Sequence, residues 1–443
     1  MQSTDISGVI DNARFNRFHW SVLFWCALII VFDGYDLVIY GVVLPVLMKQ
    51  WGLSPIEAGA LGSYALFGMM AGAMLFGPLA DRFGRKKVIA ACVLLFSGFT
   101  VLNGFAATPG QFGVCRFIAG LGIGGVMPNV VALISEYAPK RIRSLLVAVM
   151  FSGYSVGGML SATLGMLLMP TLGWQWVFFV AGALLLLLPA ILLFLPESVG
   201  FLLRAGREDE ARDILARLDP DFAAPAGVPL RMPAAITRGA PLFALFREGR
   251  ALRSLMLWTA FFACLLMVYA LNSWLPKLMV KAGYDLGSSL SFLLVLNFGA
   301  IFGAVGGGWL GDRINLPRVL AAFFALAALS IGLLGHPQPA WLLNALIAVA
   351  GATTIGSQIL LYALGAQFYP MAMRSTGLGW ASGVGRNGAI LGPILGGALL
   401  GMELPLDYNF YAFALPGVLA CAAMAVFAAG HRAPDLPALA ATA

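Results

Sequence analysis

Two carboxylates stand inside the first strongly apolar stretch of the sequence, where they have the right chemistry to carry protons. In "VFDGYDLVIYG", Asp33 and Asp36 are three residues apart, so on a helix they share roughly one face. They are the only formal charges between Arg17 and Lys49. If the stretch lies in a membrane, each charge near its middle costs at least about 2.5 kcal/mol. Two neighbouring carboxylates disfavour each other's ionisation, so we predict a coupled proton site at this pair.

The composition indicates that the stretch does lie in a membrane. The 443 residues are 60% hydrophobic and 11% charged, with a mean hydropathy of +0.89. An ordinary soluble domain is about 25% charged. Apolar runs of about 17 to 25 residues recur along the chain, which is the length that crosses a bilayer as a helix. Because the runs lack the alternation of a barrel strand, we predict an all-α integral membrane protein. The twelve predicted spans are 20–44, 56–80, 88–107, 111–135, 144–169, 174–195, 254–276, 287–311, 317–335, 340–368, 376–400 and 408–430.

The basic residues predict which side of the membrane holds the termini. Twelve spans place both termini on one side. If that side is the cytoplasm, the termini and inner loops hold 22 of the 27 Lys and Arg, and the outer loops hold three. This asymmetry satisfies the positive-inside rule, so we predict a multi-pass protein of a bacterial inner membrane with both termini cytoplasmic. The net charge of +7 follows from this topology and requires no nucleic acid partner.

The chain divides into two similar halves. Residues 196–253 form the only long polar segment and are predicted to be a cytoplasmic linker between the halves 1–195 and 254–443. Within the linker, "REDEARDILARL" has the spacing of an amphipathic helix. Three motif pairs recur at one offset of 231 residues: "LPVLMKQWG" and "LPKLMVKAG", "GPLADRFGRKKV" and "GWLGDRINLPRV", and "EYAPKRIRS" and "QFYPMAMRS". Many secondary transporters contain such a duplication, with the binding site near the midplane between the repeats.

These motifs carry a family resemblance. The loop "GPLADRFGRKK" after the second span, Arg116 followed by "FIAGLGIGG", and "PES" after the sixth span resemble the major facilitator superfamily. The "DGYD" of the first span is similar to that of the aromatic acid:proton symporters, most closely their benzoate-type members. The resemblance implies twelve transmembrane helices in two pseudo-symmetric six-helix halves. It also implies proton-coupled uptake of a small aromatic carboxylate, without a cofactor and as a monomer.

Charged residues that recur at the offset of 231 are predicted to belong to a cytoplasmic gate. Asp81 and Arg82 recur as Asp312 and Arg313, and all four stand at predicted helix ends, where the helix dipole favours such charges. The resemblance implies that the first loop latches the half-bundles together. Simple capping and topology are the alternative interpretation. The predicted gate comprises Gly77, Asp81, Arg82, Gly84, Arg85, Glu136, Arg143, Asp312, Arg313 and Arg374.

Four intramembrane charges have no counterpart in the other half: Asp33, Asp36, Arg116 and Arg386. Arg386 lies twelve residues, roughly 18 Å of helix, beyond Arg374, which places it near the midplane. A guanidinium there can hold a carboxylate through two hydrogen bonds. Arg116 is predicted to line the same cavity, or else to be a structural residue of the superfamily.

An aromatic substrate also needs rings and polar tips around it. The predicted lining residues are Asn387, Tyr40, Tyr269, Asn272, Trp274, Asn297, Gln358 and Tyr362, each of which is otherwise a helix-packing residue. Gly34, Gly41 and Pro45 predict a bend or exposed backbone in the first span.

Three other functions stay open. The same fold can carry a hydroxybenzoate, another organic acid, a sugar or a drug. The chain can instead be a sensor of aromatic acids, or a channel. We predict no enzyme activity and no metal site, because no nucleophile with a base and no metal-ligand spacing is visible; the five cysteines fall within predicted spans and read as buried thiols.

Overall fold

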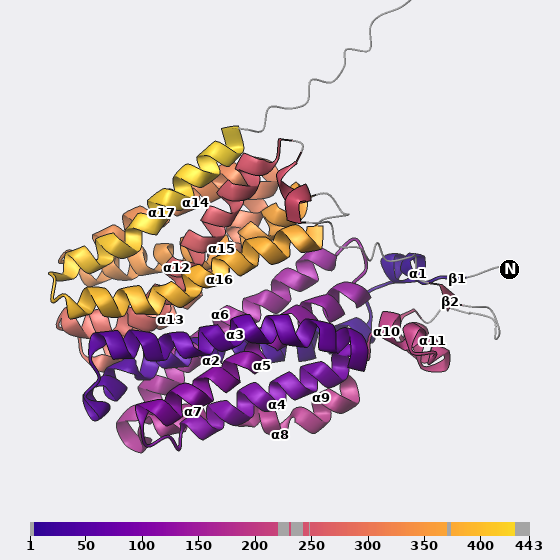
Figure 1. The fold of residues 1–443 in the computed structure, drawn as a ribbon, viewed down its shortest axis with the longest axis horizontal. Helices are drawn as coiled ribbons and strands as arrows, with labels where there is room; N and C mark the ends of the chain where they lie inside the picture. Colours follow the sequence, from indigo (N-terminus) through magenta and orange to yellow (C-terminus); the bar gives the residue numbers. More distant parts are fainter. Residues whose placement is uncertain (1–3, 220–229, 232–241, 248, 370–373, 430–443) are drawn as a thin grey trace, which may run out of the picture.

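The fold is a bundle of long helices (Figure 1). The computed structural model describes residues 4–219, 230–231, 242–247, 249–369 and 374–429. Two strands of two residues each, β1 (Thr4–Asp5) and β2 (Leu230–Arg231), pair in parallel beside the bundle. The helices of the first half are α1 (Ile6–Asn12), α2 (Arg17–Trp51), α3 (Pro55–Phe83), α4 (Arg85–Asn103), α5 (Pro109–Tyr137), α6 (Arg143–Leu172), α7 (Gln175–Val180), α8 (Ala183–Leu186) and α9 (Leu188–Phe194).

The linker and the second half continue the pattern. The linker contains α10 (Val199–Arg204), α11 (Glu208–Leu218) and the 3-10 helix η1 (Leu242–Phe246). The second half consists of α12 (Ala251–Lys281), α13 (Leu286–Arg313), α14 (Leu316–Leu333), α15 (Ala340–Phe368), α16 (Arg374–Gly401) and α17 (Leu406–Ala429). The amphipathic helix predicted in the linker is confirmed as α11, which buries Ala211, Leu215 and Leu218.

The predicted spans agree with the observed helices. Among the described residues, eleven helical segments are long and apolar enough to cross a membrane, with α7 to α9 together forming one of them. The twelfth predicted span corresponds to α16, whose Arg386, Asn387 and many glycines lower its mean hydropathy. Most observed helices extend a few residues past the predicted spans, because capping residues such as Asn16, Ser54 and Thr108 lie outside the apolar runs.

The duplication seen in the sequence is also present in the helix boundaries. Five helices of the second half begin 231 residues after their first-half counterparts: Pro55 and Leu286, Arg85 and Leu316, Pro109 and Ala340, Arg143 and Arg374, and Gln175 and Leu406. The packing repeats as well, since α2 packs on α6 as α12 packs on α16, and α3 packs on α5 as α13 packs on α15. The two six-helix halves are therefore pseudo-symmetric.

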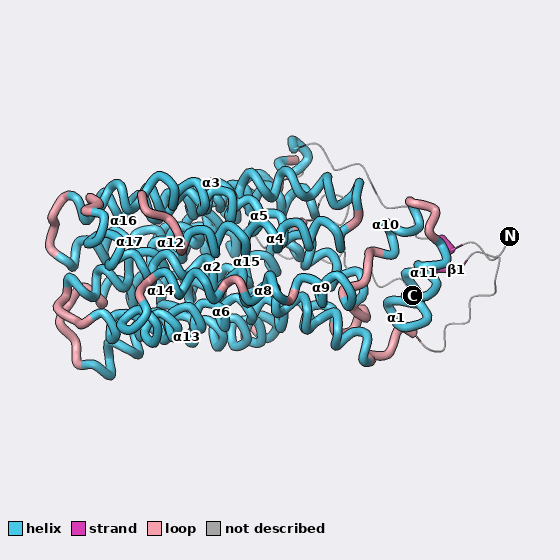
Figure 2. Tube along the Cα trace, turned by 90° about the horizontal axis from the view of Figure 1, so that it is seen from below, coloured by secondary structure: helices cyan, strands magenta, loops and turns pink. Residues whose placement is uncertain are grey.

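The halves meet through α3 with α16, α6 with α13, and α2 with α12. We call the end of the bundle that carries α10 and α11 the linker side, and the other end the opposite side (Figures 1 and 2). Several close contacts between halves lie toward the opposite side: Ser63 Oγ donates to the Ile390 carbonyl at 2.8 Å, and Gly59 packs on the Pro393 backbone. The halves are thus closed against each other toward the opposite side.

The bend predicted in the first span is absent, since α2 is one continuous helix from Arg17 to Trp51. Gly34 instead permits a close helix contact. A Cβ atom at Gly34 would lie 2.1 Å from the Tyr154 carbonyl oxygen of α6. The glycine between the two carboxylates therefore brings α6 against the face of α2 that carries them.

Candidate functional site

Asp36 is paired inside the first half. Arg116 on α5 donates from Nη1 to Asp36 Oδ2 at 2.8 Å and from Nη2 to the Asp36 carbonyl at 3.2 Å. The Thr100 hydroxyl on α4 donates to the other carboxylate oxygen, Oδ1. Asp36 and Arg116 are each only 1% exposed. Because both charges are buried and mutually neutralised, this pair avoids the cost that either charge alone would carry.

Asp33 lies one helical turn away without such partners. It is fully buried, and neither carboxylate oxygen accepts a hydrogen bond from any residue that the structure describes. The charges that act on it are Arg386 from the second half and Asp36 on its own helix. A buried carboxyl group that receives no hydrogen bond is most easily accommodated when it carries a proton.

Arg386 is half-buried on α16 and reaches toward the first half. Its Nη1 lies 3.8 Å from the Met69 Sδ on α3, and its electrostatic neighbours are Asp33, Tyr154, Tyr269 and Tyr362. Thioether sulfur is a weak acceptor, so the guanidinium keeps most of its donors for another partner. The structure thereby brings together the guanidinium and Asp33, which come from opposite halves.

Three tyrosines surround this guanidinium. Tyr154 on α6 and Tyr269 on α12 are hydrogen-bonded to each other across the boundary between halves. Tyr362 on α15 packs edge-on against Phe261, with ring centroids 5.1 Å apart, and its hydroxyl pairs with Ser382. Rings with polar tips around an arginine provide both apolar area and directed hydrogen bonds.

Two of the other predicted lining residues hold helices together. Tyr40 donates its hydroxyl to the Ala58 carbonyl of α3. Trp274 is fully buried and donates from Nε1 to the Pro393 carbonyl of α16 at 2.8 Å. Their polar tips are therefore occupied by backbone groups in this structure.

The amide side chains behave differently from one another. Asn272 and Asn297 are buried, donate back to their own helices, and leave Oδ1 without a hydrogen-bond donor among the described residues. Asn387 is exposed and donates to the Gly383 carbonyl of its own helix at 3.2 Å, while Gln358 is half-buried on α15. Asn272 and Asn297 thus have an acceptor still to be satisfied.

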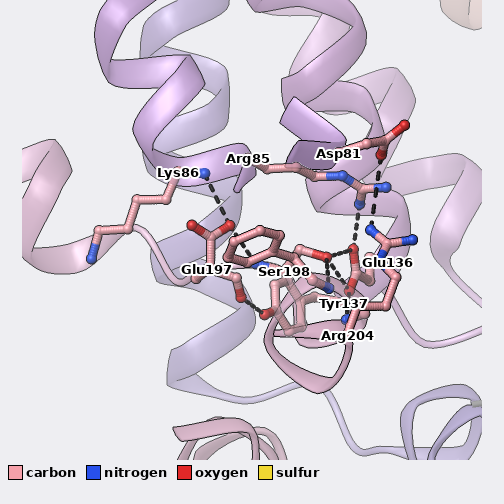
Figure 3. Close-up of polar contacts among 10 residues, drawn as sticks. Asp81, Arg85, Lys86, Glu136, Tyr137, Glu197, Ser198 and Arg204 are labelled. Atoms are coloured by element: carbon pink, nitrogen blue, oxygen red, sulfur yellow. Dashed lines mark hydrogen bonds and ion pairs between the residues drawn. The ribbon is translucent and has the colours of Figure 1, made fainter. Parts of the chain in front are cut away.

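A second cluster joins the loop between α3 and α4 to the start of the linker (Figure 3). Arg85 forms an ion pair with Glu136 at the end of α5. The same carboxylate accepts hydrogen bonds from the Ser198 hydroxyl, at 2.8 Å to Oε2, and from the Gly200 backbone N–H at 3.0 Å. Glu136 therefore fastens both the α3–α4 loop and the N-terminus of α10 to α5.

Glu197 completes the cluster from the other direction. Its Oε1 accepts a hydrogen bond from the Lys86 backbone N–H at 3.1 Å, which caps the start of α4, and its carbonyl accepts the Tyr137 hydroxyl. Gly84 has a φ of 97°, a left-handed value that favours glycine. A Cβ atom there would lie 2.3 Å from Glu197 Oε2. The glycine of the loop motif thus makes room for the carboxylate.

The remaining predicted gate residues lie apart from this cluster. Asp81 is exposed and 3.9 Å from Arg204, and Arg143 binds Asp11 at 2.6 Å. Arg82 is exposed, and Arg313 lies over the Trp309 ring at 4.2 Å. Gly77 lies on α3, with no heavy atom within 4 Å of the position of a Cβ atom. The side chains of Asp312 and Arg374 lie outside the described residues. All printed ion pairs of the first loop are with the first half or the linker, so the latch between halves stays a prediction.

Sequence reasoning missed Tyr154, Met69, Thr100 and the capping role of Glu197. Tyr154 had a usable signal, because position 155 is the repeat equivalent of Arg386 and the two helices are pseudo-symmetric. Thr100 had none, since a threonine on an apolar helix is common. Among the described residues there is no group of three or more His, Cys, Asp or Glu that could hold a metal ion. The arrangement offers a guanidinium for an anion, a carboxyl group for a proton, and aromatic surface between them.

Comparison with known proteins places this geometry in a family. A family profile described as "Major Facilitator Superfamily" matches residues 26–387. A "Benzoate transport protein" of Acinetobacter baylyi (strain ATCC 33305 / BD413 / ADP1) is 49% identical over 422 residues, which cover 94% of this chain and 91% of the relative. A "4-hydroxybenzoate transporter PcaK" of Pseudomonas putida is 37% identical, with coverage of 95% of this chain and 94% of the relative.

A solved structure has the same fold. The xylose transporter XylE from E. coli, in a partially occluded inward open conformation, gives a TM-score of 0.73 at 18% identity, covering 93% of this chain and 98% of that chain. The relatives are named as transporters rather than as enzymes, in agreement with the prediction from sequence. The predicted resemblance, including its benzoate-type branch, is confirmed, and the chain belongs to the Major Facilitator Superfamily.

Proposed function

We propose that this protein imports a small aromatic carboxylate, benzoate first, together with protons by alternating access. The observation that carries the proposal is the juxtaposition of Arg386 and Asp33, which face each other from opposite halves with Tyr154, Tyr269 and Tyr362 around them. In the proposed mechanism, the guanidinium binds the substrate carboxylate and the tyrosine rings contact its aromatic ring. Asp33 carries a proton in the loaded state, and Asp36 takes part through its ion pair with Arg116.

Coupling to protons has a thermodynamic reason. An anion that enters a negative-inside cell works against about 2.3 kcal/mol per 100 mV of membrane potential. One accompanying proton cancels this cost, and a second makes uptake electrogenic. Asp33 suits the role because, when it is neutral, no buried charge stays unpaired beside the Asp36–Arg116 pair.

The same residues suggest how substrate and proton influence each other. A bound carboxylate at Arg386 neutralises the cation that otherwise favours ionised Asp33, so substrate binding favours proton uptake at Asp33. The hydrogen bond between Tyr154 and Tyr269 connects the two walls of the site. Loss of substrate on the cytoplasmic side restores the attraction of Arg386 for an ionised Asp33 and thereby promotes proton release.

The proposed orientation follows the distribution of basic residues. The linker side carries most of the Lys and Arg, so it is assigned to the cytoplasm of a bacterial inner membrane, with both termini there. The site is complete within one chain, which supports function as a monomer. The linker-side cluster around Glu136 serves as part of the cytoplasmic gate by holding α4, α5 and α10 together in the first half.

The alternative substrate is a hydroxylated benzoate. The relatives include transporters named for 4-hydroxybenzoate and gallate, at 37% and 38% identity. Asn272 and Asn297 each have a buried carbonyl oxygen without a donor, and a ring hydroxyl can supply one. A site that pairs these oxygens with substrate hydroxyls rejects plain benzoate, so the two substrates are distinguishable by affinity.

The test is uptake of labelled benzoate into liposomes that contain the purified protein, under an imposed inward proton gradient. We expect accumulation above equilibrium that collapses with a protonophore, and competition by unlabelled benzoate at lower concentration than by 4-hydroxybenzoate or gallate. Stronger competition by a hydroxylated acid transfers the proposal to that acid. Uptake that ignores the gradient contradicts proton coupling, and binding without any uptake indicates a sensor.

A further inference from the structure

A buried asparagine inside the first half has no partner for either of its polar groups. Asn103 is the last residue of α4 and is fully buried. Neither its Nδ2 donor nor its Oδ1 acceptor forms a hydrogen bond with any residue that the structure describes. Leaving a buried amide unsatisfied is costly, and buried polar groups of this kind are normally satisfied by an ordered water.

The position of Asn103 links it to the Asp36 site. Ser97, Thr100 and Asn103 are spaced by three residues and line one buried face of α4. Ser97 donates to the Ala181 carbonyl and Thr100 donates to Asp36, so Asn103 is the member without a partner. It lies one turn, roughly 4.5 Å along the helix, beyond Thr100 toward the opposite side. Arg116 Nε is likewise buried without a hydrogen-bond acceptor.

The end of α4 is closed by an aromatic ring. A Cβ atom at the neighbouring Gly104 would lie 2.3 Å from the Phe179 ring, and Phe179 packs against Phe105 with centroids 4.8 Å apart. One aromatic contact therefore stands over Asn103 on the opposite side. The polar face of α4 continues inward from it to Asp36.

We propose that Asn103 binds a buried water that relays protons between the opposite side and Asp36, by a route separate from the substrate site at Arg386. This inference deepens the proposed proton-coupled transport and rests on it. The water accepts a proton arriving from the opposite side and passes one of its own to an Asp36 carboxylate oxygen. One O–H bond breaks and another forms, Asp36 becomes neutral, and Arg116 keeps its charge.

The groups around Asp36 are compatible with this transfer. On its own helix, Asp33, Tyr35 and Tyr40 are the neighbouring titratable residues, and Tyr35 already donates to the Val177 carbonyl of α7. α5 contributes Arg116 and α4 contributes Thr100 and Asn103. Thr100 occupies Oδ1 and Arg116 occupies Oδ2, so proton transfer requires one of these two bonds to open.

The hydration of Asn103 is testable without any transport assay. In a dry site, Asn103→Leu removes two unsatisfied polar groups, and the melting temperature of the purified protein rises. If Asn103 holds a water, the substitution expels it and the melting temperature stays level or falls. Ser97→Ala on the same face is the matched control, because it removes a hydrogen bond to backbone and lowers the melting temperature in either case. A rise for Asn103→Leu alone overturns the proposal.

The relay itself is tested by comparing two transport modes in liposomes. Asn103→Leu is expected to slow proton-driven accumulation at least tenfold, while exchange of labelled for unlabelled substrate at equal pH stays within twofold of the parent. Asn103→Ser, which keeps a polar group and room for water, is expected to recover most of the rate. Equal losses in both modes, or no loss in either, contradict the relay. If the parent itself shows no proton-driven uptake, the proposed function fails, and the melting experiment still decides whether Asn103 is hydrated.

Discussion

Asp36 Oδ2 and Arg116 Nη1 lie 2.8 Å apart, and both side chains are almost completely buried. Removing one partner of such a pair leaves an uncompensated charge, which costs about 3–5 kcal/mol. We therefore expect Arg116→Gln to lower the melting temperature strongly, and Asp36→Asn to do the same.

The double variant Asp36→Asn/Arg116→Gln separates charge from packing. Because it contains no buried charge, it is expected to be more stable than Arg116→Gln alone. Thermal denaturation of the four detergent-purified proteins completes the double-mutant cycle. Strictly additive losses mean that the two residues do not interact as the structure shows.

Asp33 is expected to respond in the opposite manner. Since its oxygens receive no hydrogen bond from described residues, Asp33→Asn replaces a neutral acid by a neutral amide of similar shape. We predict a melting temperature close to that of the parent, loss of gradient-driven accumulation, and retained substrate exchange. Asp36→Asn is the matched control, because it alone of the two breaks an ion pair. Full gradient-driven accumulation by Asp33→Asn removes this residue from the proton pathway.

Arg386 is expected to determine substrate affinity. A hydrogen bond to a charged group contributes about 1.5–3 kcal/mol, so Arg386→Gln should raise the apparent KM for benzoate roughly ten- to hundredfold. Arg386→Lys keeps the charge but not the two-pronged geometry, and an intermediate KM is expected. Initial rates of uptake over a range of benzoate concentrations measure both. Unchanged KM in Arg386→Gln places the carboxylate elsewhere.

The two tyrosines that bridge the halves have a matched pair of variants. Tyr154→Phe and Tyr269→Phe each delete one hydroxyl of the same hydrogen bond and leave the rings in place. We expect each to alter the KM by a similar factor and the double variant to add little further change. Independent, multiplying effects contradict a shared hydrogen bond at the site.

Two glycines at either end of the same helix test the linker-side cluster. Gly84 has a φ of 97°, and a Cβ atom there meets the Glu197 carboxylate, so Gly84→Ala is expected to cost at least about 1 kcal/mol of stability. Gly98 lies within α4 with no heavy atom within 4 Å of a Cβ position. Gly98→Ala is therefore expected to be neutral or stabilising. Melting temperatures of the two variants check the contrast, and an equal response contradicts it.

The sequence by itself determined the helices and the duplication. Hydropathy and capping are local properties, so apolar runs bounded by residues such as Ser54 and Thr108 specify where helices begin. The offset of 231 residues is kept by the helix starts because both halves descend from the same pattern of runs and loops. The four intramembrane charges were also visible, since charge in an apolar run is expensive and therefore conspicuous.

Only the tertiary structure decided which charges and polar groups meet. It paired Asp36 with Arg116, left Asp33 without a hydrogen bond among the described residues, and placed Tyr154 against Tyr269. Helices that are apolar on all sides carry little information about which face turns inward, so their rotation and partners depend on close packing in three dimensions. Gly34 illustrates the reason: it reads as a bend in the sequence, but its missing Cβ admits the backbone of α6 and thereby sets the geometry of both carboxylates.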